Sequence, residues 1–445
     1  MSIFRAYDVR GIYPRELNKK IVEKLGKAFG TFNPGKIVIG MDARLSSPIL
    51  KKSLAKGLLS TGCKVIDIGM VTTPVLMFGV KHLKADGGVM VTASHNPKEY
   101  NGLKFYSKNA IPLSYESGIN KIKGIMEKED FLEGRGILSR ADVLEDYSRF
   151  LLEKIKFKKK IRVEVVVDAS NGPAGLIVPK VLRRIGLKVH ELFCKPDGNF
   201  PGHEPDPSNE RNLTKLKEKV LEVGADIGLA YDGDGDRLGV VDELGSIVNS
   251  IEVFGLLIMN ELNENPHAMV VHDILIPSVI PNLIRKYDCT PVVSRVGYAY
   301  VRQKMTEVDA LLGGEVAGHY YFKETFWFDD PLFTSLKLIE FLMKTGKSVS
   351  GLVKLLPKYF YKTMRVPVDE NKKHAVIERI KELALKENYK VDFLDGVKIL
   401  LDYGWVVFRP SNTEPKISIA YEAKDEKNFN RLRIFVENML REVMR

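Results

Sequence analysis

Short apolar segments that alternate with amphipathic helical segments constrain the fold of this 445-residue chain more than any other feature. Near the N-terminus, residues 36–42, 63–70 and 87–93 are continuous apolar runs, and leucines at helical spacing follow the first of them. The Ser-Ser-Pro sequence at 46–48 predicts the start of that helix, with a serine at its N-cap. Continuous apolar strands joined by helices are typical of a mostly parallel sheet that helices cover on both faces.

The same alternation restarts near residues 162 and 268. After about residue 358 the pattern changes to three strand-like runs flanked by helices, which favours an α+β domain with an antiparallel sheet. We therefore predict an α/β protein with three related mixed-sheet domains and a C-terminal α+β domain. The expected domain ranges are 1–147, 148–249, 250–358 and 359–445.

Charge and cysteine content limit the possible classes of function. The net charge is +11, but lysine and arginine alternate with acidic residues along predicted helices, so we expect no nucleic-acid partner. No apolar stretch is long enough to span a bilayer, and the first residues do not form a secretory signal. Cys63, Cys194 and Cys289 are far apart and form no CxxC pair, which indicates buried free thiols and a reducing, cytoplasmic location.

The segment VTASHNPKEYNGLKF, residues 91–105, contains the first candidate for chemistry. Ser94 follows an apolar strand in a loop, where it could be a nucleophile or carry a phosphate. His95 and Lys104 are near enough in sequence to polarise its oxygen or to neutralise phosphate charge. The alternative is an N-cap serine at the start of a helix. The absence of GxSxG disfavours a serine hydrolase.

The segment AYDGDGDRLGVVDELG contains three aspartates at alternate positions, Asp232, Asp234 and Asp236. Carboxylates that can turn toward one point suit a hard divalent cation, and three ligands leave room for a substrate oxygen, which favours catalytic Mg²⁺. An EF-hand loop is disfavoured because Arg237 stands where glycine is needed and the next residues predict a strand. A purely structural acidic turn is the remaining alternative, and Arg237 could hold phosphoryl oxygens.

Two other loops carry weaker signals. In GGEVAGHYYF, Glu315 could accept hydrogen bonds from sugar hydroxyls, and His319 could transfer a proton or be purely structural. In RPSNTEPK, Arg409 could clamp a phosphate that backbone amides cradle, although a solvated turn is equally compatible with this segment.

Two segments of the first domain complete the set. FRAYDVRG supplies Tyr7 and Arg10 near the N-terminus. GMDARLSS supplies Asp42 and Arg44 at a strand end, and we expect these two to form a structural ion pair and not to contact substrate.

Taken in order, FRAYDVRG, TASHNP, DGDGDR, GGExxGH and RPSNTEP resemble the motifs of the α-D-phosphohexomutase family, and within it the phosphomannomutase/phosphoglucomutase enzymes. The motifs extend from residue 4 to residue 415. The resemblance implies four domains around a central cleft. It also implies reversible phosphoryl transfer between C1 and C6 of mannose or glucose phosphate, through phosphoserine and hexose 1,6-bisphosphate. A phosphoglucosamine mutase and a metal-dependent sugar phosphatase are the alternatives.

The resemblance also implies roles for individual residues. The catalytic residues would be Ser94, Arg10, Lys104 and His319. The Mg²⁺ site would comprise Ser94, through its phosphate, with Asp232, Asp234 and Asp236. The residues that bind or line the substrate would be Tyr7, His95, Arg237, Tyr298, Glu315, Ala317, Arg409, Ser411, Asn412 and Thr413. The implied partners are small sugar phosphates, and we expect a monomer or weak homo-oligomer.

Three positions depart from the family pattern, and all three concern sugar binding. Ala317 stands where serine is common, which removes one hydroxyl contact. Leu275 stands where many members carry lysine, and Tyr298 where relatives often have histidine or aspartate. The sugar preference is therefore the part of the function that the sequence determines least.

Overall fold

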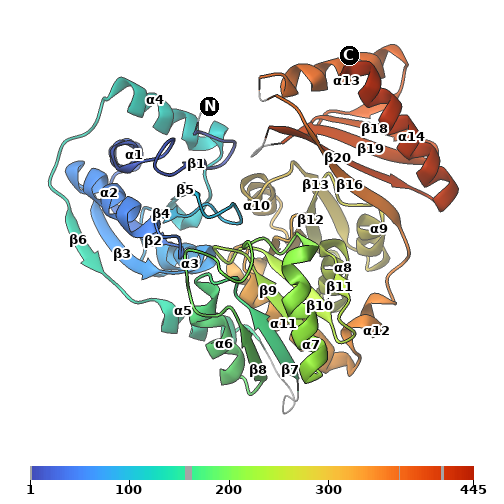
Figure 1. Cartoon of the computed structure of the whole chain (residues 1–445), viewed down its shortest axis with the longest axis horizontal. Helices are drawn as coiled ribbons and strands as arrows, with labels where there is room; N and C mark the ends of the chain where they lie inside the picture. Colours follow the sequence, from blue (N-terminus) through green and yellow to red (C-terminus); the bar gives the residue numbers. More distant parts are fainter. Residues whose placement is uncertain (1–2, 156–162, 370, 412–414, 445) are drawn as a thin grey trace. The chain divides into compact units, whose positions relative to one another are not determined.

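The computed structural model describes residues 3–155, 163–369, 371–411 and 415–444 (Figure 1). The chain divides into two compact units, one formed by residues 1–260 and 317–354 and the other by residues 261–316 and 355–445. Three sheets with flanking helices precede an antiparallel C-terminal sheet, which confirms the predicted fold class. None of the helices in the described part of the chain is both long enough and apolar enough to cross a membrane.

The first sheet has the strand order β1-β5-β4-β2-β3-β6. Its strands are β1 (Val9–Ile12), β2 (Lys36–Met41), β3 (Lys64–Met70), β4 (Gly87–Val91), β5 (Tyr100–Ser107) and β6 (Ile137–Arg140). The predicted apolar runs form β2, β3 and β4, which are parallel, whereas β5 runs antiparallel to both β1 and β4. Apolar periodicity does not reveal β1 and β5 because they contain buried polar residues, among them Arg10 and Lys104.

Helices of the first domain are α1 (Lys19–Phe32), α2 (Ser47–Ser60), α3 (Thr73–His82), α4 (Asn120–Lys128) and α5 (Leu144–Leu152). The helix predicted after the first strand is α2, but no serine side chain caps it. Instead, Ser46 Oγ accepts a hydrogen bond from Asn101 Nδ2 at 2.8 Å, and Ser47 Oγ donates to Asp42. These serines therefore serve tertiary contacts, which the local sequence pattern does not show.

Helices α1 and α2 cross closely at two glycines. A Cβ on Gly57 would lie 2.1 Å from the carbonyl oxygen of Glu23, and a Cβ on Gly26 would lie 2.5 Å from that of Leu54. The close approach lets both helices bury their apolar residues in one core with the sheet, such as Leu25 with Ile37.

The second sheet has the order β11-β10-β9-β7-β8. Its strands are β7 (Glu164–Asp168), β8 (Lys188–Leu192), β9 (Ile227–Tyr231), β10 (Leu238–Asp242) and β11 (Ile247–Val248), and its helices are α6 (Ala174–Arg184) and α7 (Thr214–Val223). Strands β9 and β10 are antiparallel neighbours, so a short loop at residues 232–237 joins them. The strand predicted after the three aspartates is therefore present, and no exiting helix of the EF-hand type follows them. Elements α8 (Ser250–Glu261), β15 (Tyr320–Phe322), α11 (Pro331–Thr345) and α12 (Val349–Val353) follow later in the chain.

The second unit contains the parallel strands β12 (Met269–Asp273), β13 (Thr290–Ser294) and β14 (Leu312–Gly314), with helices α9 (Val279–Lys286) and α10 (Tyr298–Glu307). Its C-terminal sheet is antiparallel, in the order β16-β20-β19-β18-β17. The bounds are β16 (Phe360–Pro367), β17 (Lys390–Asp392), β18 (Val397–Leu401), β19 (Gly404–Pro410) and β20 (Lys416–Ala423), with α13 (Lys373–Lys386) and α14 (Glu426–Val443). The three-residue strand β17 was too short to be predicted.

Side chains of β19 alternate between two cores. Val406 and Phe408 pack in the core that α13 and α14 share with the sheet. Trp405 and Val407 belong to a second cluster, which includes Leu275 in the loop after β12. Alternation along one strand thus joins the C-terminal sheet to the preceding domain within this unit.

The helix crossing gives a stability prediction. Gly57→Ala should lower the free energy of unfolding by about 1–3 kcal/mol, because the methyl group would push α1 and α2 apart. Gly124 is the matched control, since a Cβ there meets no atom within 4 Å on helix α4. Gly124→Ala should raise stability by about 0.5–1 kcal/mol. Thermal unfolding followed by circular dichroism measures both, and a Gly57→Ala protein as stable as the unmodified chain would contradict the close crossing.

Candidate active site

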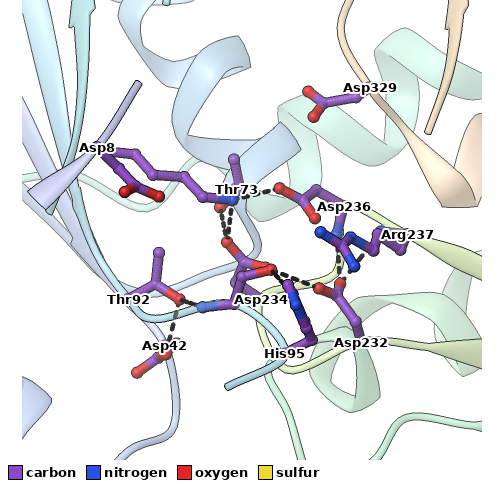
Figure 2. Close-up of polar contacts among 12 residues, drawn as sticks. Asp8, Asp42, Thr73, Thr92, His95, Asp232, Asp234, Asp236, Arg237 and Asp329 are labelled. Carbon is purple, nitrogen blue, oxygen red and sulfur yellow. Dashed lines mark hydrogen bonds and ion pairs between the residues drawn. The ribbon is translucent and has the colours of Figure 1, made fainter. Parts of the chain in front are cut away.

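Ser94 is buried in the loop between β4 and β5, with 1% of its surface exposed. Its φ is 51°, a left-handed backbone conformation that costs free energy for a residue with a Cβ. Its Oγ donates a hydrogen bond to Asp232 Oδ2 at 2.8 Å, and His95 Nδ1 lies 3.3 Å from Ser94 Oγ (Figure 2). The chain enters β5 at Tyr100, so Ser94 caps no helix.

The three predicted aspartates lie together in the loop that joins β9 to β10. Asp232, Asp234 and Asp236 are buried, and one oxygen from each carboxylate lies within 4.8 Å of the other two. Asp232 Oδ1 accepts hydrogen bonds from the backbone N–H groups of Asp236 at 2.8 Å and Arg237 at 3.1 Å, which holds the loop in a tight turn. Ser94 and this loop, which are separated by more than a hundred residues in the sequence, thus belong to one site.

Lys104 of β5 reaches into this acidic group. Its Nζ lies 2.7 Å from Asp234 Oδ2 and also contacts Asp236 Oδ2. Burial alone would lower the pKa of Lys104, but the two carboxylates raise it well above its usual value. Burial would raise the pKa of Asp234, and the charge of Lys104 lowers it instead. Lys104 is therefore a fixed cation at this site.

The acidic group has carboxylate oxygens that Lys104 does not contact. Burial, followed by repulsion from Asp236 and Asp234, raises the pKa of Asp232 well above its usual range. Asp234 Oδ1 and Asp236 Oδ1 are buried and accept no hydrogen bond within the described ranges. Buried carboxylate oxygens without partners are costly, and such oxygens are the ligands that hard divalent cations prefer. The group therefore fits a divalent cation.

Thr73 connects the first domain to the acidic loop. Its Oγ1 donates to Asp234 Oδ2 at 2.6 Å, and its backbone N–H donates to the Asp234 carbonyl at 2.8 Å. Thr73 was not identified from the sequence, because a threonine followed by proline indicates only the start of a helix. The contact fixes Asp234 relative to α3.

Arg10, which the resemblance implies as a catalytic residue, contacts the loop that carries Ser94. Arg10 in β1 donates from Nε to Asp8 Oδ2 at 2.8 Å and from an Nη to Asn96 Oδ1 at 2.6 Å. Burial alone would lower the pKa of Arg10, but the charge of Asp8, followed by that of Tyr7, raises it. Asp8 was not identified from the sequence, although it belongs to the FRAYDVRG motif.

His319 joins the site through both ring nitrogens. Its Nε2 lies 3.2 Å from Arg237 Nε, and because the guanidinium can only donate, Nε2 is the acceptor. The ring proton then lies on Nδ1, which is 3.0 Å from the Asp236 carbonyl and 3.3 Å from Asp329 Oδ2. Burial raises the pKa of Asp329, a residue that was not identified from the sequence. Ala317, partly buried, precedes this histidine by two residues.

The remaining sugar and phosphate candidates lie in the second unit. Glu315 Oε2 accepts a hydrogen bond from the backbone N–H of Gly297 at 2.9 Å, immediately before the buried Tyr298 that begins α10. Asp273 is also buried there, and burial followed by repulsion from Glu315 raises its pKa to about 7. Leu275 packs against Trp405 in an apolar cluster, so a leucine at this position has a structural role.

Arg409 lies within β19, one residue before its end. Its Nε donates to Asp395 Oδ2 at 3.1 Å, whereas its buried Nη2 makes no hydrogen bond within the described ranges. Ser411 is buried just after this strand, and its carbonyl accepts from Lys373 Nζ at 2.8 Å. Asn412 and Thr413 lie outside the described residues.

Comparison with known proteins gives one consistent result along the whole chain. Residues 1–133, 145–245 and 252–359 match phosphoglucomutase/phosphomannomutase alpha/beta/alpha domains I, II and III, and residues 364–438 match the C-terminal domain of the same family.

Individual relatives match over nearly their full lengths. The chain is 36% identical over 448 residues to a phosphomannomutase/phosphoglucomutase of Pseudomonas aeruginosa, covering 99% of this chain and 96% of the relative. It is 37% identical to a phosphoglucomutase/phosphomannomutase of Thermococcus kodakarensis, covering 96% and 95%. A crystal structure of a family protein from Burkholderia thailandensis superimposes with a TM-score of 0.91 at 31% identity, covering 99% and 97%. The chain therefore belongs to the phosphoglucomutase/phosphomannomutase family.

Proposed function

We propose that this chain is a phosphomannomutase/phosphoglucomutase, an isomerase that moves a phosphoryl group between C1 and C6 of mannose or glucose phosphate. The observation that carries the proposal is the hydrogen bond from Ser94 Oγ to Asp232, beside Lys104 and the buried Arg10. A hydroxyl placed among cations and potential metal ligands suits a phosphoryl carrier, because the site can neutralise the charge of a transferring phosphoryl group. Family membership agrees with this reaction.

In the proposed reaction, phosphoserine 94 donates its phosphoryl group to the free hydroxyl of a hexose 1-phosphate or 6-phosphate. A bond forms between the sugar oxygen and phosphorus, the bond between phosphorus and Ser94 Oγ breaks, and the hydroxyl proton passes to a base. The hexose 1,6-bisphosphate then turns within the enzyme, and its other phosphate returns to Ser94 by the reverse step. Each step conserves the phosphoryl group and the proton.

We assign proton transfer and charge neutralisation to different residues according to their charge. His319 Nε2 is the unprotonated nitrogen and is the candidate proton acceptor once substrate displaces the Arg237 contact. Lys104 stays protonated, so we assign it to charge neutralisation together with Arg10. Mg²⁺ held by Asp232, Asp234, Asp236 and the Ser94 phosphate would supply further charge stabilisation when bound.

Substrate recognition is assigned to loops from several domains. Arg409, one guanidinium nitrogen of which has no hydrogen-bond partner among the described residues, would bind the phosphate that does not react, together with Ser411, Asn412 and Thr413. Glu315 would bind sugar hydroxyls. The residues that would line the rest of the substrate site are Tyr7, His95, Arg237, Tyr298 and Ala317.

Burial of the carrier favours a mutase over the phosphatase alternative. Ser94 has only 1% of its surface exposed, so water has little access to a phosphoryl group that is held there. The phosphoglucosamine mutase alternative has less support, since the relatives described above are named for mannose and glucose. The cytoplasmic location and the monomeric or weakly oligomeric state stay predictions.

Replacing the carrier tests the proposal. Ser94→Ala should abolish conversion of mannose 1-phosphate to mannose 6-phosphate while leaving the circular dichroism spectrum unchanged, because no other group would accept the phosphoryl group. Ser139→Ala is the matched control, since Ser139 is exposed on β6 of the same domain. In the unmodified protein, intact-mass measurement after treatment with glucose 1,6-bisphosphate should locate one phosphate on Ser94. Appreciable turnover by Ser94→Ala would contradict the proposal.

The metal assignment has a binding test that is independent of activity. Asp234→Asn should weaken Mg²⁺ or Mn²⁺ binding by at least about tenfold in titration calorimetry, because an amide is a poorer ligand than a carboxylate. Asp226→Asn, which alters an exposed aspartate next to β9, should leave the affinity unchanged. Equal affinities in all three proteins would place the metal elsewhere.

A further inference from the structure

Arg44 makes several hydrogen bonds next to Ser94, and only 1% of its surface is exposed. Its two terminal nitrogens donate to four backbone carbonyls of the loop that carries Ser94. These are the carbonyls of Ser94 at 2.7 Å, Asn96 at 2.6 Å, Pro97 at 2.7 Å and Tyr100 at 3.0 Å. One planar guanidinium therefore fixes the whole loop between β4 and β5.

Asp42 connects this guanidinium to the other side of Ser94. Its Oδ2 accepts hydrogen bonds from Arg44 Nε at 3.0 Å and from Thr92 Oγ1 at 2.8 Å. Thr92 Oγ1 in turn accepts from the backbone N–H of Ser94 at 2.8 Å, and Figure 2 shows Asp42 and Thr92 to the left of the acidic group. The N–H of Ser94 is therefore connected to Asp42 through Thr92, and its C=O accepts a hydrogen bond from Arg44 directly.

Such restraint is needed because Ser94 has an unfavourable backbone conformation. At a φ of 51° the residue would relax to a negative φ if its peptide groups were released, and its Oγ would turn away from Asp232. The Arg44 guanidinium has no donor left for a substrate, because its five N–H groups donate to Asp42 and to the four carbonyls, and the ring of Phe200 lies 5.3 Å from it.

We propose that Arg44 and Asp42 are positioning residues for phosphoryl transfer, acting through Thr92 and the loop carbonyls to aim Ser94 Oγ at the acidic group. This inference rests on the proposed function of Ser94 as phosphoryl carrier. The predicted structural ion pair between Arg44 and Asp42 is present at 3.0 Å, and the proposal adds that this pair affects the rate of the reaction. Because the pair does not touch the sugar, its loss should change the transfer rate and not the affinity for substrate.

The sharpest test compares two variants of one hydroxyl. Thr92→Val removes the hydroxyl and keeps the shape, whereas Thr92→Ser keeps the hydroxyl. In a single-turnover experiment, glucose 1,6-bisphosphate phosphorylates the dephosphorylated protein and the mass of the intact chain gives the rate. Thr92→Val should be slower by about 100-fold, and Thr92→Ser should recover most of this loss. In steady state the KM for glucose 1-phosphate should stay unchanged while kcat falls.

Arg44→Lys tests the second half of the network. A lysine keeps the charge but cannot donate to Asp42 and four carbonyls together, so the transfer rate should fall by a similar factor. Lys51→Met is the control, because it removes a partly buried ion pair with Asp67 in the same domain, 2.6 Å long, without touching the loop. Its transfer rate should match that of the unmodified chain. If Arg44→Lys does not fold, the Thr92 pair decides alone.

The outcomes separate the two proposals. Phosphorylation of Ser94 at the unmodified rate in Thr92→Val would overturn the positioning role and leave the proposed function standing. Equal slowing in Thr92→Val and Thr92→Ser would also overturn it, since the hydroxyl would then not be the group that matters. Failure of the unmodified protein to accept phosphate on Ser94 would instead overturn the proposed function itself.

Discussion

Compensation of buried negative charge is the constraint on which the candidate site depends. Asp232, Asp234 and Asp236 are almost fully buried, and carboxylates in such a place are tolerated only when cations or hydrogen-bond donors meet them. Lys104 supplies one cation from the neighbouring sheet, and Arg237 supplies another from the same loop. The acidic loop and β5 therefore stabilise each other, and a bound metal would share this role.

The same constraint explains why residues from different sheets meet. Strands β4 and β9 each end in a polar loop, and the two loops touch through Ser94 and Asp232. Thr73 adds a second connection from the first domain to the second, at the start of α3. A ligand at strand ends is typical of α/β folds, but here the site forms only where two such ends converge. The position of each loop depends on contacts with the other.

Sequence reasoning predicted the strands with continuous apolar residues and the loops that follow them, because periodicity and composition are local signals. It found Ser94, the three aspartates and the Asp42–Arg44 pair from unusual polar residues beside strands. Thr73 and Asp329 were not predicted. Thr73 belongs to the site because it contacts Asp234, which is distant in sequence, and Asp329 because it contacts His319 across a turn. Sequence reasoning also missed β1 and β5, since buried polar side chains that belong to the site break their apolar pattern.

Asp329 and Asp330 show how backbone conformation separates two identical side chains. Asp330 Oδ1 accepts from the Phe333 N–H at 3.0 Å and caps α11, while its Oδ2 accepts from the Tyr147 hydroxyl at 2.7 Å. Asp329, its neighbour, turns toward His319. The preceding Phe326 and Trp327 have φ values of 58° and 57°, and this left-handed turn redirects the chain before the two acids. Asp330 therefore stabilises the start of α11, whereas Asp329 orients the candidate proton acceptor.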